Sequence, residues 1–322
     1  MSLLNPKELK KAAERSLDAA AYSPKKLALI HGALSAAALL IISLLDLLLS
    51  QQIGATGGLS GMGARAMLST VQSTLSLGLS IAMPFWEMGL LYACLQFSRK
   101  EDVSTSSLAE GFRRFGPLLR LMLLEAAICG AVGILAANIS SFIFMMTPLS
   151  YGFITAAQTI PMEELTVESM MPLMKAAIPL YLIMAAVLLI LLIPIIYRFR
   201  MAGFYLLSNG HRRALAALGV SNRITAGNRF SLFKLDLSFW WYYGGIFLLT
   251  FIANADVIFG LPNWASYVFY LVYLAGQVLL SWQAAAYVQT TYAHAFDTLL
   301  SNDDGEKPLV RNFPWGFLPD AE

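Results

Sequence analysis

Four charged side chains lie within apolar stretches of this sequence, where a charge needs a specific partner. They are two acids and two bases, Glu87, Glu125, Arg198 and Arg200. A lone charge in the hydrocarbon core of a bilayer costs about 2.5–3.5 kcal/mol or more, so opposite charges there are expected to pair or to line a wet cavity. A carboxylate beside a guanidinium can hold a proton or bind a charged substrate. These residues therefore predict an intramembrane polar site.

All four charges are expected at one depth in the membrane. Each lies about eight to ten residues from the cytoplasmic end of its apolar stretch, or ~10–15 Å from the inner surface at about 1.5 Å per residue. Glu87 or Glu125 is therefore predicted to lie within salt-bridge distance of Arg198 or Arg200, beside a cavity that opens to the cytoplasm. The alternative is structural: an ion pair that fixes helix register, or arginines whose heads extend to the interface.

The other residue types that carry chemistry in proteins form no motif here. The histidines, His31, His211 and His294, fall near the cytoplasmic interface on different elements, without ligand spacing or a nearby cysteine, so no metal site is predicted. Phosphate-loop, zinc-protease and nucleophile-elbow motifs are absent from the sequence. We therefore expect a protein that is not an enzyme and that has no cofactor and no bound metal.

The elements that must position the charges are long apolar stretches. Hydrophobic residues make up 57% of the chain and charged residues 13%, whereas an ordinary soluble domain has about 25% charged residues. A helix needs about 20 apolar residues to cross a ~30 Å hydrocarbon core. Six stretches reach that length and predict transmembrane helices at 27–50, 71–97, 118–146, 178–207, 238–259 and 265–294.

The predicted fold class is all-α: a polytopic bundle of six transmembrane helices that forms a single membrane domain over residues 1–300. Residues 301–322 are rich in Pro, Gly and acidic side chains and are expected to be a disordered cytoplasmic tail. The lipid bilayer is the expected partner of such a bundle.

The basic residues orient the predicted bundle. Of the 22 Lys and Arg residues, 20 fall on one side of the six spans, and only Arg65 and Lys175 fall on the other. Because cytoplasmic loops carry the excess of positive charge, both termini are predicted to be cytoplasmic. No nucleic-acid partner is predicted, because the basic residues flank spans, where membrane orientation explains them.

Two cytoplasmic segments are expected to lie on the inner leaflet as amphipathic helices, 5–21 and 212–224. The first has Asn5 as a cap and Pro6 at its first helical position, and its apolar residues share one face. Basic side chains at such an interface favour anionic lipid. The lipid-interface candidates in and after the second segment are Arg212, Arg213, Arg223, Arg229 and Lys234.

Short motifs in the second half of the chain resemble a known family. The motifs are ALGVS at 217–221, AGNR at 226–229, LFKLDLSF at 232–239 and TYAHAF at 291–296. Together with the basic start at 7–17, they resemble the domain-of-unknown-function family 975. The resemblance implies a bacterial six-span protein of the plasma membrane and no agreed activity.

Two functions remain open from the sequence. The intramembrane charges favour a non-catalytic membrane component that handles or exports a small amphiphile or peptide, or that assists a transporter. The alternative is a membrane scaffold or partner-binding protein whose intramembrane charges are structural. In that case its two long cytoplasmic loops would dock another membrane protein.

Overall fold

The structure is a computed structural model in which the described residues form helices and no strand. It describes residues 4–55, 59–158, 167–208, 213–255 and 263–303. The chain divides into two compact units, one made of residues 1–118 and 201–322 and the other of residues 119–200. The predicted all-α class is confirmed. The predicted tail lies outside the described residues from position 304 onward.

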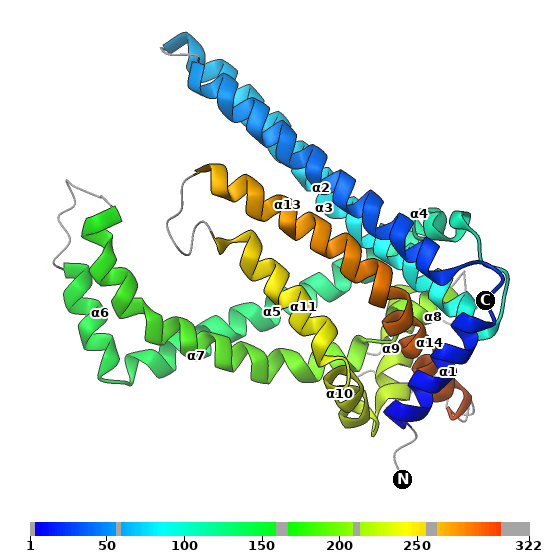
Figure 1. The fold of residues 1–322 in the computed structure, drawn as a ribbon. Coiled ribbons are helices and arrows are strands. Elements are labelled where there is room, and N and C mark those ends of the chain that lie inside the picture. Colours follow the sequence, from blue (N-terminus) through cyan, green and yellow to red (C-terminus); the bar gives the residue numbers. More distant parts are fainter. Residues whose placement is uncertain (1–3, 56–58, 159–166, 209–212, 256–262, 304–322) are drawn as a thin grey trace. The chain divides into compact units, whose positions relative to one another are not determined.

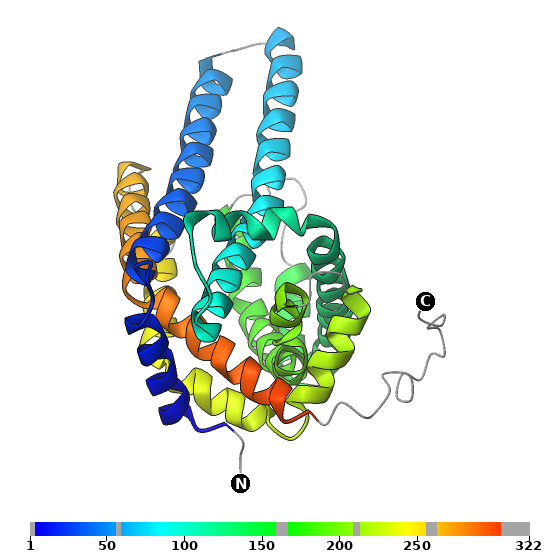
Figure 2. The same ribbon diagram turned by 90° about the vertical axis from the view of Figure 1, so that its right-hand side faces the viewer.

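The first unit contains a long helical hairpin with further helices packed along it (Figure 1). Its elements are α1 (Pro6–Asp18), α2 (Pro24–Ala55), α3 (Leu59–Arg99), the 3-10 turn η1 (Thr105–Ala109), α4 (Glu110–Arg113), the start of α5 (Phe115–Met145), α8 (Ala202–Ser208), α9 (Ala214–Thr225), α10 (Arg229–Leu237), α11 (Trp240–Ala253), α13 (Asn263–Leu280), the π-helical turn η2 (Ser281–Ala285) and α14 (Ala286–Ser301). Helices α2 and α3 run antiparallel, α13 lies against α2, and α14 packs on α3 (Figure 2).

Helix α1 forms as the sequence predicts, but its apolar face contacts protein. The Asn5 side chain accepts a hydrogen bond from the Lys7 backbone N–H at 3.1 Å, and Pro6 is at the start of the helix. Leu9 and Ala13 are 6% and 0% exposed, and α1 packs against α14 and α3. The apolar face is therefore covered by other helices of this unit. The exposed face carries both basic and acidic side chains, namely Lys7, Lys11 and Arg15 with Glu8, Glu14 and Asp18.

Further contacts join α1 to the turn between α10 and α11 and to α14. Lys10 Nζ donates to the Ser238 carbonyl at 2.8 Å and lies 4.1 Å from the centre of the Phe239 ring. Burial lowers the pKa of Lys10, and the nearby Glu14 carboxylate partly opposes that shift. Ser16 Oγ is 3.0 Å from Nε2 of His294 on α14. These contacts fix α1 as part of the fold.

Among the described residues, five helical segments are long and apolar enough to cross a membrane, which indicates a membrane protein. They are Pro24–Leu44, Ser69–Arg99, Phe115–Met145, Pro172–Ser208 and Ala265–Ser301. A sixth span exists if the bent pair α10 and α11, with 64° between its helices, is counted as one.

The predicted fifth span, 238–259, differs from the structure at its start. Helix α10 ends at Leu237, and α11 begins only at Trp240 and is 14 residues long. The Ser238 hydroxyl donates to the Leu235 carbonyl at 2.6 Å, and the Ser238 N–H also bonds to the last turn of α10. These hydrogen bonds give partners to the carbonyl groups at the end of α10, which stabilises the break between the two helices.

Two glycines let η1 and α4 pack directly on the α3 backbone. A Cβ added at Gly89 would lie 1.9 Å from the Leu108 carbonyl oxygen, and one added at Gly111 would lie 1.9 Å from the Phe85 carbonyl oxygen. No side chain fits at either position. This backbone contact holds the stretch of α3 that carries Glu87.

The second unit contains the rest of α5, together with α6 (Leu149–Gln158) and α7 (Val167–Phe199). Phe144 of α5 meets Phe153 of α6 edge to face, with ring centroids 5.9 Å apart. Three of the four predicted intramembrane charges, Glu125, Arg198 and Arg200, belong to this unit.

Candidate functional site

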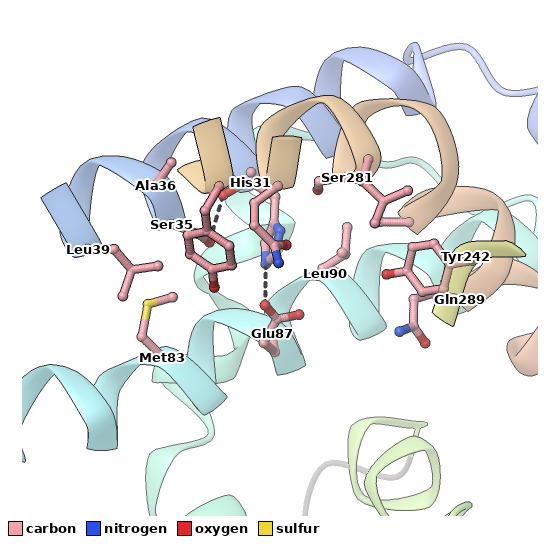
Figure 3. A pocket seen from close by; sticks show the side chains of 15 residues that line it. His31, Ser35, Ala36, Leu39, Met83, Glu87, Leu90, Tyr242, Ser281 and Gln289 are labelled. Carbon is pink, nitrogen blue, oxygen red and sulfur yellow. Dashed lines mark hydrogen bonds and ion pairs between the residues drawn. The ribbon is translucent and has the colours of Figure 1, made fainter. Parts of the chain in front are cut away.

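The first unit encloses a cavity of about 210 Å³ between its membrane-spanning helices (Figure 3). Most of its wall is formed by α2, α3, α13, η2 and α14, and α11 contributes Tyr242. The lining residues are His31, Gly32, Ser35, Ala36, Leu39, Met83, Glu87, Leu90, Tyr242, Tyr273, Gln277, Leu280, Ser281, Ala285 and Gln289. The lining combines amide, hydroxyl, imidazole and carboxylate groups with aliphatic side chains.

His31 of α2 is held firmly at the wall of this cavity. Its side chain is buried, with 4% of the residue exposed. The imidazole stacks on the indole of Trp86 from α3, with ring centroids 5.6 Å apart and an interplanar angle of 5°. Trp86 Nε1 donates to the His31 carbonyl at 3.2 Å, and Ser35 Oγ donates to the same carbonyl at 2.9 Å. Both the backbone and the ring of His31 are therefore fixed.

The His31 ring points toward Glu87, and Nε2 lies 3.6 Å from Glu87 Oε1 (Figure 3). That distance would suit an ion pair only with a protonated imidazole, and it is longer than a hydrogen bond, whose N···O distance is usually about 2.9–3.0 Å. Neither ring nitrogen of His31 has a hydrogen-bond partner among the described residues. A buried polar atom without a partner costs about 1–3 kcal/mol. Such an atom at a cavity wall is a group that a ligand can satisfy.

A stripe of residues four apart faces the cavity from the last span: Gln277, Ser281, Ala285 and Gln289. In a regular α-helix each step of four residues drifts by about 40° around the axis. The π-helical turn Ser281–Ala285 is wider and removes most of that drift. The π turn therefore keeps the polar ends of the stripe on one face, and π turns are frequent at functional sites.

Helices α2 and η2 meet closely beside this stripe. Ser281 Oγ donates to the Ala28 carbonyl at 3.1 Å. A Cβ added at Gly32 would lie 2.8 Å from Ser281 Cβ. On the opposite wall, Pro84 within α3 lacks the N–H that would bond to the Ser80 carbonyl. A π turn in the last span and a proline in α3 therefore lie beside the His31–Glu87 pair.

A family model described as a protein of unknown function, DUF975, matches residues 4–302. The chain belongs to DUF975. The match covers every described helix and all the residues that line the cavity. Of the described residues, Asp303 alone lies beyond it. The chain matches no curated protein and no solved structure.

Of the four predicted intramembrane charges in the DUF975 chain, Glu87 lines the cavity. Glu125, Arg198 and Arg200 belong to the second unit. The pairing of Glu87 or Glu125 with Arg198 or Arg200 stays a prediction. The Arg200 guanidinium lies 5.9 Å from the centre of the Tyr197 ring.

The predicted lipid-interface residues of the DUF975 chain make several protein contacts. Arg223 pairs with Asp303, and Arg229 donates to Asn222 Oδ1 at 2.8 Å. Lys234 Nζ lies 4.7 Å from the Phe230 ring centre, and Arg213 is exposed at the start of α9. Arg212 and His211 lie outside the described residues. A role of these side chains in binding lipid stays a prediction.

Sequence reasoning missed His31, which it treated as one of three scattered interfacial histidines. The usable signal was its neighbourhood: a histidine within an apolar run, on the helix that pairs in antiparallel fashion with the helix of Glu87. The depth in the membrane predicted a common site only for residues with a permanent charge. The arginines were therefore the predicted partners of Glu87, and the titratable His31 was not among them.

Proposed function

We propose that this chain is a non-catalytic protein of the bacterial plasma membrane that binds a small amphiphile in the His31–Glu87 cavity and handles or exports it. The observation that carries the proposal is a cavity of mixed polar and apolar lining among membrane-spanning helices. Its wall includes a buried histidine whose ring nitrogens have no hydrogen-bond partner among the described residues. Polar and ionisable groups at such depth mark substrate pathways more often than they serve packing.

The size and lining of the cavity support a small amphiphilic ligand. Pockets for drug-sized molecules usually measure about 300–1,000 Å³, and this cavity of about 210 Å³ is smaller. Leu39, Met83 and Leu280 supply apolar wall, whereas Gln277 and Gln289 supply amide groups. A molecule with one polar group and a short apolar part matches both surfaces.

The orientation belongs to the same proposal. With both termini in the cytoplasm, as the distribution of Lys and Arg favours, α2 would enter the membrane at Pro24 from the inside. His31 follows Pro24 by seven positions, about 10 Å of helix. The cavity would then lie in the inner half of the bilayer, within reach of the cytoplasm.

The alternative, a membrane scaffold, is favoured by a different observation. His31 contacts Trp86 twice, through the stacked rings and through the hydrogen bond to its carbonyl. A histidine used in this way fixes the register of α2 against α3 without any ligand. In the scaffold the cavity would hold only water or lipid, and a partner protein would bind the cytoplasmic elements.

Ligand-induced stabilisation distinguishes the two functions. The full chain in lipid nanodiscs would be heated with a panel of short-chain amphiphiles that differ in their head groups. Ala36 lines the cavity, and Ala36→Phe would fill it in part. We expect at least one compound to raise the Tm of the native chain, by an amount equivalent to about 2.7 kcal/mol at 100 times its Kd, and to leave Ala36→Phe unchanged. A scaffold would show equal shifts in both proteins.

A further inference from the structure

The charges that line the cavity are unbalanced. Its 15 lining residues include one carboxylate, Glu87, and no lysine or arginine. The Glu87 side chain is 56% exposed, and in the part of the chain that the structure describes the one basic nitrogen near its carboxylate is His31 Nε2, at 3.6 Å. An ionised carboxylate accepts up to about four hydrogen bonds. Most of its acceptor capacity therefore remains available to a ligand.

We propose that the ligand of this cavity carries a protonated amine that binds the Glu87 carboxylate. This inference rests on the proposed function and names the chemical class of its ligand. An ammonium group donates up to three N–H bonds, and a charge-assisted bond to a carboxylate is about twice as strong as a neutral one. A cation also compensates the cost of holding a carboxylate among membrane-spanning helices.

The groups beside Glu87 complete a site for an ammonium head. The phenol rings of Tyr242 and Tyr273 line the same cavity, and the faces of aromatic rings attract cations within about 6 Å. Gln277 and Gln289 also line it, and an amide side chain has an oxygen that accepts N–H bonds. An anionic head group would meet the Glu87 carboxylate, with no basic side chain other than His31 in the lining.

The apolar part of the ligand has a separate place. Figure 3 shows Leu39 and Met83 on one side of the His31–Glu87 pair and Tyr242 and Gln289 on the other. At the ~30 Å³ that one water occupies in the liquid, the cavity of about 210 Å³ holds about seven water-sized groups. The ligand class is thus a small amine with a short aliphatic chain, which would extend along Leu39 and Met83.

Three probes of equal length test the head group: hexylamine, hexan-1-ol and hexanoate. Each would be titrated by calorimetry at neutral pH into the full chain in nanodiscs of uncharged lipid, with empty nanodiscs subtracted. We expect hexylamine to bind the native chain at least about tenfold more tightly than the other two, as a charge-assisted bond implies. Ammonium chloride alone should bind more weakly than hexylamine, because it lacks the apolar part.

Variants locate the binding. Glu87→Gln should weaken hexylamine binding by about tenfold or more, and Glu87→Asp should keep most of it. Glu101→Gln, a matched change at an exposed position outside the cavity, should leave it unchanged.

Hexylamine affinity that is equal in the native chain and Glu87→Gln, or no tighter than that of hexan-1-ol or of ammonium, would overturn the inference. If hexan-1-ol or hexanoate binds the native chain and not Ala36→Phe, the amphiphile function stands and the amine is wrong. If no probe responds to Ala36→Phe, both fall.

Discussion

His31 Nε2 and Glu87 Oε1 lie 3.6 Å apart on two antiparallel helices, α2 and α3, that form the central hairpin of the first unit. The His31 side chain is buried, whereas the Glu87 side chain is accessible from the cavity. The contact therefore links a fixed interior side chain to one that a ligand can reach. The pair gives the sequence-predicted site residue Glu87 a partner on a neighbouring helix.

The first prediction is that these two residues are coupled in stability. His31→Phe would keep the stack on Trp86 and remove both ring nitrogens, and Glu87→Gln would remove the charge. Polar interactions between membrane helices average about 0.6 kcal/mol and reach about 1.7 kcal/mol. We expect a coupling energy in this range from a double-mutant cycle of unfolding in detergent. Additive effects of the two substitutions would show that the pair does not interact.

The second prediction concerns the glycine contacts that support the α3 segment carrying Glu87. Gly89→Ala and Gly111→Ala should each lower the Tm and the yield of folded protein strongly, because the new Cβ would meet a carbonyl oxygen at 1.9 Å. Gly78→Ala on the same helix α3 is the matched control, since nothing lies within 4 Å of its added Cβ. It should be neutral, or stabilising by up to about 1 kcal/mol through helix propensity. Similar Tm values for all three variants would contradict the close backbone packing.

The third prediction separates packing of α1 on the protein from binding to lipid. Leu9→Ala should destabilise the docked helix by about 2–5 kcal/mol, the usual range for a buried leucine, and speed hydrogen exchange of the α1 amides. Lys11 is exposed on the same helix, so Lys11→Ala should leave exchange unchanged. If Lys11→Ala releases α1 and Leu9→Ala does not, lipid contact holds the helix in place.

The fourth prediction is the orientation in the membrane. In a background with Cys94 and Cys129 replaced by serine, a cysteine at Ser104 or Asn222 should resist a membrane-impermeant thiol reagent added to intact cells. A cysteine at Gly58 or Glu164, which lie outside the described residues, should react. External labelling at Asn222 would contradict cytoplasmic termini.

Features that depend on local sequence were predictable. The apolar runs marked the long helices, and Asn5 with Pro6 marked the start of α1, because span length and helix caps are set by residues close together in the chain. The family resemblance was also confirmed over residues 4–302.

Features that depend on how helices meet were not predictable from one sequence. Amphipathicity does not say whether Leu9 faces lipid or α14. The break before Trp240 depends on hydrogen bonds of Ser238 that an apolar run does not reveal. The His31–Glu87 contact joins residues 56 positions apart in sequence, and only the register of α2 against α3 brings them together.

The most direct test of the central claim is native mass spectrometry of the full chain released from lipid nanodiscs, followed by identification of any bound small molecule. The cavity account predicts about one small amphiphile per native chain, as expected if one molecule fills the His31–Glu87 cavity. Glu101→Gln should retain the same molecule and Ala36→Phe should lose it. A native chain that carries no small molecule, or Ala36→Phe that retains as much as the native chain, would contradict the account.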